Sequence, residues 1–263
     1  MTVLDIVDLQ VKFGESASAA VKGVNLSVAR GERVGIIGES GSGKSVTAMS
    51  VLRLNNERIM QYGEPSQVIY RDQNILKADE KTLRGLRGSE IGMIFQDPMS
   101  VLNPVFKVGA QVLDVLRTHS ALSKAEGKVR VIESFGEVGI RDPERVFNQY
   151  PHELSGGMRQ RVMIAMAIAS GPRLLIADEA TSALDVTVQA AVLSTLDRLA
   201  DFMNMSILMI THDMGVVARF CDRVYVMRGG EVVESGDVVK VMESPGHEYT
   251  RSLLAAVPRL PRK

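Results

Sequence analysis

Hydrophobic and polar residues alternate along the first thirty positions of the chain. Apolar side chains recur over 3–11 and again over 21–28, which is typical of antiparallel strands with one covered face. A short apolar run follows over 33–37 and ends in Gly38. Such a run predicts a buried strand of a parallel sheet. The other elements expected in this part of the chain are a helix over 46–54 and strands over 68–70 and 90–95.

The pattern becomes mostly helical from about residue 106. We interpret 98–170 as an inserted helical subdomain, in which 156–169 forms the helix that returns to the sheet. Strands and helices then alternate, which indicates a parallel sheet with helices on its faces. The expected elements are strands over 173–177, 206–210 and 223–227, helices over 186–202 and 214–220, and a C-terminal surface helix over about 246–257.

These elements predict one α/β domain over 1–263. Its core would comprise 1–97 and 171–240, with a mostly parallel sheet and an N-terminal antiparallel β-subdomain. A chain of 263 residues is long enough to bury a full hydrophobic core without disulfide or metal staples.

Composition narrows the class of protein. Hydrophobic residues make up 45% of the chain, which is ordinary for a globular protein. Lysine plus arginine equals aspartate plus glutamate at 31 each, so no overall basic excess favours nucleic acid. The single cysteine, Cys221, excludes an intrachain disulfide and a cysteine cage for a metal. Apolar runs are too short to span a membrane, and the first residues do not resemble a secretory signal, so we expect a soluble cytoplasmic protein.

The strongest motif follows the predicted buried strand at Gly38. It matches the phosphate-binding pattern G-x-x-x-x-G-K-[ST], whose glycines let backbone N–H groups face the phosphates of a nucleotide. Lys44 is expected to reach the β- and γ-phosphates, and the Ser45 hydroxyl is expected to hold Mg²⁺. A chance match in a glycine-rich turn is the alternative, but the strand before it and the helix after it favour the phosphate site. The motif reads Gly38, Glu39, Ser40, Gly41, Ser42, Gly43, Lys44, Ser45.

Two acidic residues end another apolar run, 174–177. Asp178 would lie at the carboxyl edge of the sheet, where ligands of parallel sheets bind, and would complete the Mg²⁺ shell. Glu179 is placed to activate an attacking water as general base. Alone, such an acidic pair is more often a helix N-cap. In a chain that also has the phosphate-binding motif, an acidic pair is expected as the second part of the nucleotide site.

A third motif opens the helix predicted after residue 155. Ser155, Gly156 and Gly157 present a hydroxyl, backbone N–H groups and the positive end of a helix dipole, a combination that suits a phosphate. A plain serine N-cap is the alternative.

Together the motifs resemble the ATP-binding cassette (ABC) family in order and spacing. That family has the P-loop ATPase fold, with ATP and Mg²⁺ bound between two cassettes packed head to tail. The resemblance implies that Ser155 and Gly157 contact the nucleotide held by the partner cassette. The motifs that carry it are the phosphate loop, Gln96, Leu154 to Gly157, Asp178 with Glu179, Ser182 to Asp185, and Thr211 to Asp213.

The resemblance also implies roles for single residues. Gln96 would sense Mg²⁺ and the γ-phosphate, and His212 would position the γ-phosphate and the attacking water. Asp185 would lie in the loop that crosses the dimer. Val46 stands where many cassettes have a threonine, yet its backbone N–H can still contact the α-phosphate. Phe13 is the aromatic residue placed to stack on adenine, and a core phenylalanine is the alternative.

Three stretches resemble the ATPase subunits of peptide and nickel importers, namely 35–50, 93–104 and 176–189. This branch implies two membrane permeases, contacted near Met99–Val108, a second cassette that is identical or homologous, and an extracytoplasmic solute-binding protein. It places the chain peripherally on the cytoplasmic face of the cell membrane. The cargo stays open among dipeptides, longer peptides, nickel chelates, opines and oligosaccharides.

Other classes predict different sequences. A soluble non-transport ABC ATPase is the main alternative, but the long coiled-coil insertions and paired cassettes of such proteins are absent from this sequence. A regulator without turnover would lack Glu179 or have a damaged Ser155 motif, and both are intact. An exporter subunit stays open, because the direction of transport depends on the permease.

Overall fold

The computed structural model describes residues 1–14, 18–180 and 185–256. The chain divides into two compact units: residues 1–78 with the chain from 207 onward, and residues 79–206. The predicted helical insertion, 98–170, lies wholly within the second unit.

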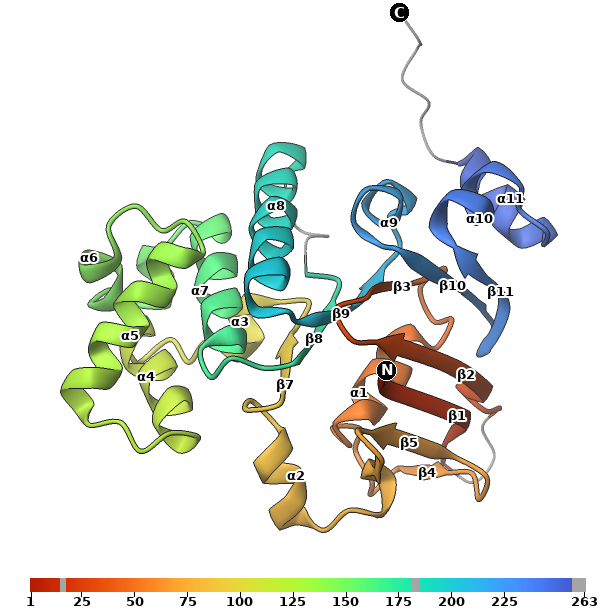
Figure 1. Ribbon diagram of the computed structural model, residues 1–263, viewed down its shortest axis with the longest axis horizontal. Coiled ribbons are helices and arrows are strands. Elements are labelled where there is room, and N and C mark those ends of the chain that lie inside the picture. The colour runs from red at the N-terminus through yellow and green to blue at the C-terminus, as the bar shows by residue number, and fades with distance from the viewer. Residues whose placement is uncertain (15–17, 181–184, 257–263) are drawn as a thin grey trace, which may run out of the picture. The chain divides into compact units, whose positions relative to one another are not determined.

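The first unit contains the antiparallel sheet expected from the N-terminal alternation (Figure 1). Strand β1 pairs with β2 so that Leu4 lies opposite Val28 and Ile6 opposite Leu26. These side chains are buried, as the alternation predicts. The strands of this sheet are β1 (Thr2–Phe13), β2 (Val21–Ala29), β4 (Met60–Tyr62), β5 (Gln67–Tyr70) and β6 (Gln73–Asn74).

The first unit also contains four strands in the order β11-β10-β3-β9. Strand β3 (Arg33–Ile37) is parallel to both β10 (Arg223–Arg228) and β9 (Ser206–Thr211), and β11 (Glu231–Asp237) is antiparallel to β10. The helical elements of this unit are α1 (Lys44–Val51), η1 (Ile75–Lys77), α9 (Met214–Phe220), α10 (Val238–Glu243) and α11 (Glu248–Ala255).

In the second unit, strands β7 (Ile91–Ile94) and β8 (Leu174–Asp178) form a parallel pair, with Ile94 opposite Ala177. Both strands are largely buried. Most of the unit is helical, as predicted (Figure 1). Its helical elements are α2 (Glu80–Leu86), α3 (Pro98–Val101), α4 (Val108–Thr118), α5 (Lys124–Glu137), α6 (Pro143–Phe147), η2 (Pro151–Glu153), α7 (Gly156–Ile168) and α8 (Val186–Met203).

Some element boundaries differ from the predictions for local reasons. Helix α1 starts at Lys44 instead of 46, because Gly43 takes a left-handed conformation and serves as the N-cap. The final helix ends at Ala255, and position 257 of the predicted range lies outside the described residues. The pattern did not predict β11 or α10. Within the described ranges, no helix is long and apolar enough to cross a membrane.

Candidate functional site

The glycine-rich turn after β3 is shaped by close backbone approaches. A Cβ at Gly38 would collide with the carbonyl oxygen of Met227. Gly43 has a φ of 97°, and a Cβ there would lie 2.6 Å from the carbonyl oxygen of Ala20. Only glycine fits both positions, since it lacks a Cβ and adopts positive φ without strain. The turn therefore has the tight backbone that a phosphate cradle requires.

Lys44 lies inside this turn and is only 4% exposed. Its Nζ donates hydrogen bonds of 2.8 Å to the carbonyl oxygens of Gly38 and Glu39. An ammonium group held by two loop carbonyls has a fixed position, so the turn carries a fixed positive charge. Lys44 and Ser45 are the first residues of α1, so the positive end of that helix dipole adds to the same field.

His212 directly follows the end of strand β9. It lies in the same unit as the glycine turn. Strands β3 and β9 are parallel neighbours, with Ile37 opposite Thr211, so the turn and His212 leave the same edge of the sheet. The His212 side chain is exposed. Asp213 caps α9 by accepting the N–H of Gly215 at 2.8 Å, which fixes the chain that follows His212.

The second unit brings together Gln96 and Glu179. Because β7 and β8 are parallel and paired, their carboxyl ends lie side by side, and the Gln96 Nε2 donates to the Glu179 Oε2 at 2.9 Å. Asp178, the last residue of β8, is 4% exposed. Glu179 has a φ of 47°, in the left-handed region that a non-glycine residue rarely occupies. Backbone strain of this kind is typical of functional sites.

Ser155 is the N-cap of α7, and its Oγ accepts the N–H of Met158 at 3.3 Å. Both Ser155 and Gly156 are exposed. A Cβ at Gly157 would lie 3.2 Å from the Val188 side chain, so a larger residue would press against α8. The capping role considered from the sequence is therefore present, and the helix terminus stays open to a phosphate.

Gln160 of α7 is 2% exposed and was not among the residues predicted for the site. Its Nε2 donates to the carbonyl oxygen of Ala180 at 2.5 Å. This bond ties α7 to the residue that follows Glu179. A glutamine followed by the apolar run 162–168 was the available signal.

Three other residues predicted for the nucleotide site lie at the start of α8, in α1 and at the end of β1. Asp185 is the N-cap of α8 and accepts the N–H groups of Thr187 and Val188 at 3.1 and 3.0 Å. Residues 182–184 of the same predicted loop lie outside the described residues. Val46 lies in α1 and is half-buried. Phe13 ends β1 and is also half-buried, so its adenine-stacking role stays a prediction.

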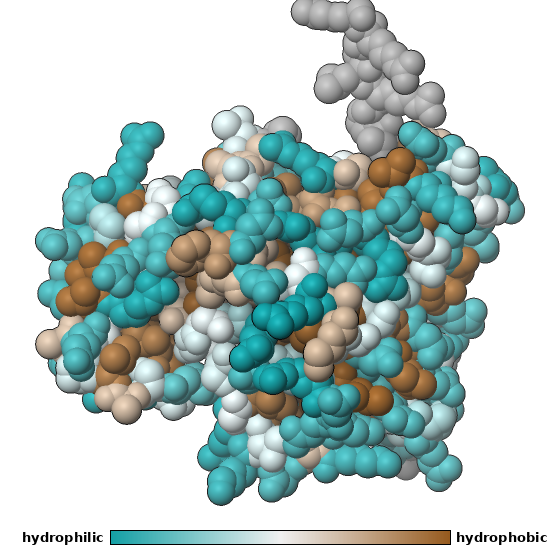
Figure 2. Space-filling view, in the orientation of Figure 1, coloured by the Kyte–Doolittle hydropathy of each residue, from teal (hydrophilic) through white to brown (hydrophobic). Residues whose placement is uncertain are grey.

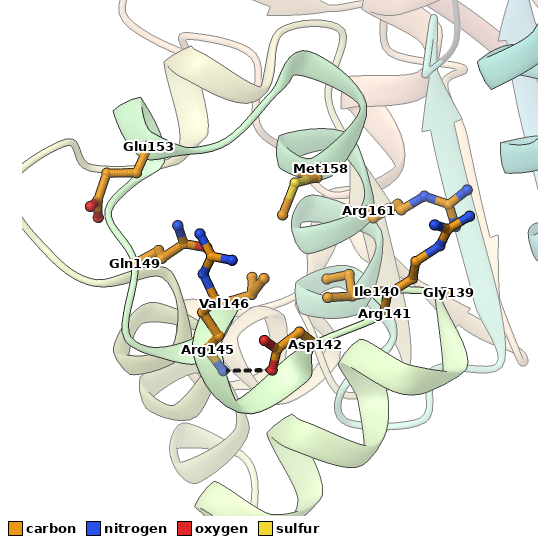
Figure 3. A pocket seen from close by; sticks show the side chains of 10 residues that line it. All are labelled: Gly139, Ile140, Arg141, Asp142, Arg145, Val146, Gln149, Glu153, Met158 and Arg161. Carbon is orange, nitrogen blue, oxygen red and sulfur yellow. Dashed lines mark hydrogen bonds between the residues drawn. The ribbon is translucent and has the colours of Figure 1, made fainter.

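A separate pocket of about 410 Å³ lies among the helices of the second unit. Figure 3 shows Arg141 and Arg161 on one side of the pocket and Arg145 on the other. Asp142 caps α6 by accepting the N–H of Arg145 at 3.3 Å. Met158 also lines the pocket, which therefore adjoins the first turns of α7. None of the predicted nucleotide residues lines it.

Comparison with known proteins identifies the family. A family model described as ABC transporter matches residues 21–182, more than half of the chain. The chain belongs to the ABC transporter family. The part of this ABC protein that the family model matches includes the glycine turn, Gln96, Ser155 and the acidic pair at the end of β8.

Two curated proteins resemble this ABC protein over nearly its whole length. The probable peptide ABC transporter ATP-binding protein y4tR of Sinorhizobium fredii is 48% identical over 258 residues, which is 97% of this chain and 77% of the relative. The oligopeptide transport ATP-binding protein OppD of Bacillus subtilis is 46% identical over 260 residues, which is 98% of this chain and 72% of the relative.

Solved structures confirm the predicted fold class. The dimeric, post-hydrolysis state of the ATP-binding cassette MJ0796, bound to ADP and Pi, matches with a TM-score of 0.79 and 30% identity over 89% of this chain and 98% of that one. The structure of cbiO1 from Clostridium perfringens matches with a TM-score of 0.79 and 27% identity over 98% of this chain and 96% of that one. This chain is an ABC ATPase.

Proposed function

We propose that this ABC ATPase powers the uptake of peptides, or of a related small solute such as a nickel chelate or an opine, through separate membrane permeases. The observation that carries the hydrolytic part is the Glu179 carboxylate, which is held in strained backbone and hydrogen-bonded to Gln96. The names of the relatives from Sinorhizobium fredii and Bacillus subtilis support the peptide cargo.

ATP binding is assigned to the glycine turn and its neighbours. The backbone around Gly41 and Gly43 surrounds the phosphates, Lys44 neutralises the β- and γ-phosphates, and the Val46 N–H reaches the α-phosphate. Phe13 stacks on adenine. The neutralising charge comes from a lysine that the carbonyl oxygens of Gly38 and Glu39 already hold in the turn.

The donor set fits Mg²⁺. We assign its protein ligands to the Ser45 hydroxyl, the Gln96 amide oxygen and the Asp178 carboxylate, the last in part through water. Hard oxygen donors and a single carboxylate suit an ion that retains several waters and shares the substrate's phosphates. The buried position of Asp178 at a strand end gives such a carboxylate a fixed direction. When bound, Mg²⁺ would neutralise charge that develops on the transferred phosphoryl group.

Hydrolysis requires a group that removes a proton from water. Glu179 performs this step, and the Gln96 amide, which donates to its Oε2, orients the carboxylate. His212 holds the γ-phosphate and the water in line. Both histidine and glutamate start from carboxyl ends of buried parallel strands, so rigid elements position them.

The partner cassette closes over the nucleotide with Ser155 and Gly157, and Asp185 lies where the two cassettes cross. The MJ0796 structures are dimeric, which supports a pair of cassettes. ATP binds the closed dimer more tightly than the open one, and this difference in affinity is the source of work. Hydrolysis removes the γ-phosphate that both cassettes contact, so the dimer opens and moves the permeases.

Ser155→Arg is expected to block ATP-driven closure while leaving ATP binding to the single chain intact. The exposed Ser155 would be replaced by a long cationic side chain at the helix terminus that must approach the phosphates. The matched control is Ser123→Arg, which removes the serine N-cap of α5 and costs a similar amount, about 1 kcal/mol, in the free energy of unfolding. Sedimentation with ATP, in a Glu179→Gln background, measures the dimer. A dimer that forms as well in the Ser155→Arg variant would show that the contact in trans is wrong.

The permease contact is assigned to Met99–Val108. Three large apolar side chains are exposed within this segment: Met99 by 44%, Val105 by 69% and Phe106 by 56%. Figure 2 shows a mainly hydrophilic surface, with small separate hydrophobic patches across the whole view. Exposed apolar clusters rimmed by polar groups are typical of protein contacts. A permease bound here places the chain peripherally on the cytoplasmic side of the cell membrane.

We propose the same domain organisation that the sequence predicts. The catalytic core comprises 1–97 and 171–240, with 98–170 as the helical subdomain that carries both the Ser155 motif and the permease contact. A soluble ABC ATPase without a permease remains the alternative, and the peptide-transport names of the relatives favour the importer.

Uptake of labelled peptides by the source cells tests the cargo. Cells lacking this chain are expected to lose import of a radiolabelled dipeptide or pentapeptide, and the wild-type chain should restore it. The Glu179→Gln variant should not restore it, because transport needs turnover. Full import of both peptides by the deleted strain would overturn the peptide assignment, while leaving the ATPase assignment to be judged on hydrolysis.

A further inference from the structure

The C-terminal part of the first unit is fastened beside the glycine turn. Glu234 of β11 accepts the N–H groups of Gly246 and His247 at 2.6 and 3.0 Å, and the His247 Nδ1 accepts the N–H of Tyr249 at 3.1 Å. These bonds fix the start of α11. Tyr249, in its first turn, is therefore held in one position relative to β11.

The Tyr249 ring is buried among side chains that lead to the glycine turn. It packs in a cluster with Ile37, the last residue of β3, and with Val226 and Val238, and only 4% of the residue is exposed. The guanidinium of Arg228 lies over the ring at 4.9 Å from its centroid. Packing and the cation–π contact require only the ring, so they do not explain the hydroxyl group.

The hydroxyl binds the glycine turn itself. The backbone N–H of Glu39 donates to the Tyr249 hydroxyl oxygen at 3.0 Å. Burial raises the pKa of the Tyr249 phenol, and the Glu39 carboxylate adds to the rise. The hydrogen bond from the Glu39 N–H lowers the pKa and offsets part of this effect. The phenol therefore stays neutral at physiological pH.

One peptide group connects Tyr249 to Lys44. The N–H of Glu39 and the C=O of Gly38 belong to the same peptide unit, and in a trans peptide these two groups point in opposite directions. The N–H is bound by Tyr249 at 3.0 Å, and the C=O is bound by the Lys44 Nζ at 2.8 Å. The plane of this peptide is thus held from both sides, and rotating it would break both hydrogen bonds.

We propose that Tyr249 is a positioning residue of the nucleotide site, which orients the Gly38–Glu39 peptide so that its carbonyl oxygen holds Lys44 ready for the phosphates. This inference rests on the proposed phosphate role of Lys44. Tyr249 does not touch the nucleotide, and it acts through the peptide and the lysine. The C-terminal helix thereby contributes to nucleotide affinity from 210 residues away in the sequence.

Tyr249→Phe tests the proposal, because it removes the hydroxyl and keeps the ring. Titration of the purified full chain with a fluorescent ATP analogue is expected to give a Kd raised about two- to tenfold, the effect of losing one ordinary hydrogen bond. The KM for ATP should rise by a similar factor, with a smaller change in kcat. The matched control is Tyr225→Phe, another buried tyrosine of the same unit, whose hydroxyl accepts the N–H of Ser27 at 3.1 Å. That control should bind nucleotide like the wild type.

The double variant Lys44→Ala with Tyr249→Phe separates a positioning role from general loss of stability. If Tyr249 acts through Lys44, removing the hydroxyl should cause no further loss of affinity once the lysine is absent. An unchanged Kd in Tyr249→Phe, or an equal loss with and without Lys44, would overturn the proposal while the nucleotide site stands. A Lys44→Ala variant that binds like the wild type would instead overturn the phosphate role and this inference with it.

Discussion

Glu179→Gln is expected to retain ATP binding and to lose nearly all turnover. Glutamine has the same shape and can still accept the hydrogen bond from Gln96, which measures 2.9 Å to the Glu179 Oε2 in the wild-type chain. It cannot remove a proton from water at neutral pH. General acid–base catalysis contributes about 10²- to 10⁴-fold to a rate, so kcat should fall by a factor in that range. The corresponding loss of transition-state stabilisation is about 3–5 kcal/mol.

The measurement is phosphate release at saturating ATP, with nucleotide binding followed on the same preparation. Glu133→Gln is the matched control, since it neutralises a carboxylate of α5 whose side chain is 58% exposed. The control should hydrolyse ATP at the wild-type rate. Hydrolysis by Glu179→Gln at the wild-type rate would remove this residue as the base, and loss of binding would mean that the residue holds the nucleotide instead.

Lys44→Ala is expected to weaken the binding of ATP to the chain, before any hydrolysis. The lysine is buried in the glycine turn and bonded to the Gly38 carbonyl oxygen. In the proposed site its ammonium group is the positive charge that meets the phosphates. A hydrogen bond to a charged group contributes about 1.5–3 kcal/mol, so Kd for ATP should rise roughly 10- to 150-fold. The carbonyl oxygens of Gly38 and Glu39 also lose their lysine donor, which should loosen the turn.

Calorimetric titration with ATP and Mg²⁺ measures this effect directly. Lys81→Ala, which removes an exposed lysine of α2, serves as the control and should leave Kd unchanged. An unchanged affinity in Lys44→Ala would contradict the phosphate role. Together with Glu179→Gln, the result assigns binding and turnover to different residues.

The motif residues could be predicted because local chemistry limits the choices at each position. A Cβ at Gly38 or Gly43 would clash with a backbone oxygen, so these positions of the turn accept only glycine. The buried strands before Gly38 and Asp178 could be predicted because short apolar runs bury well in a parallel sheet. The side-by-side placement of Gln96 and Glu179 follows from the pairing of β7 with β8.

Contacts between distant parts of the sequence could not be predicted. The bond between Tyr249 and Glu39 joins residues 210 positions apart, and nothing in either local sequence specifies the other. Strand β11 was missed because Glu231–Asp237 is rich in polar residues and includes Gly236, which lowers its strand propensity. Pairing with β10 supplies the stability that its own sequence lacks. The role of Gln160 was missed for the same reason, since its partner is the Ala180 carbonyl.

The most direct test of the account is to recover the partners of this chain from its own membranes. Tagged Glu179→Gln protein would be purified with ATP from detergent-solubilised native membranes, and the bound proteins identified by mass spectrometry. Phe106→Asp in the same background is the control, because a charge at the exposed apolar segment should release the permeases without affecting ATP binding. The account predicts two permeases, with or without a second cassette, and their loss in the control. Recovery of soluble partners alone would contradict it and would identify a non-transport ABC ATPase.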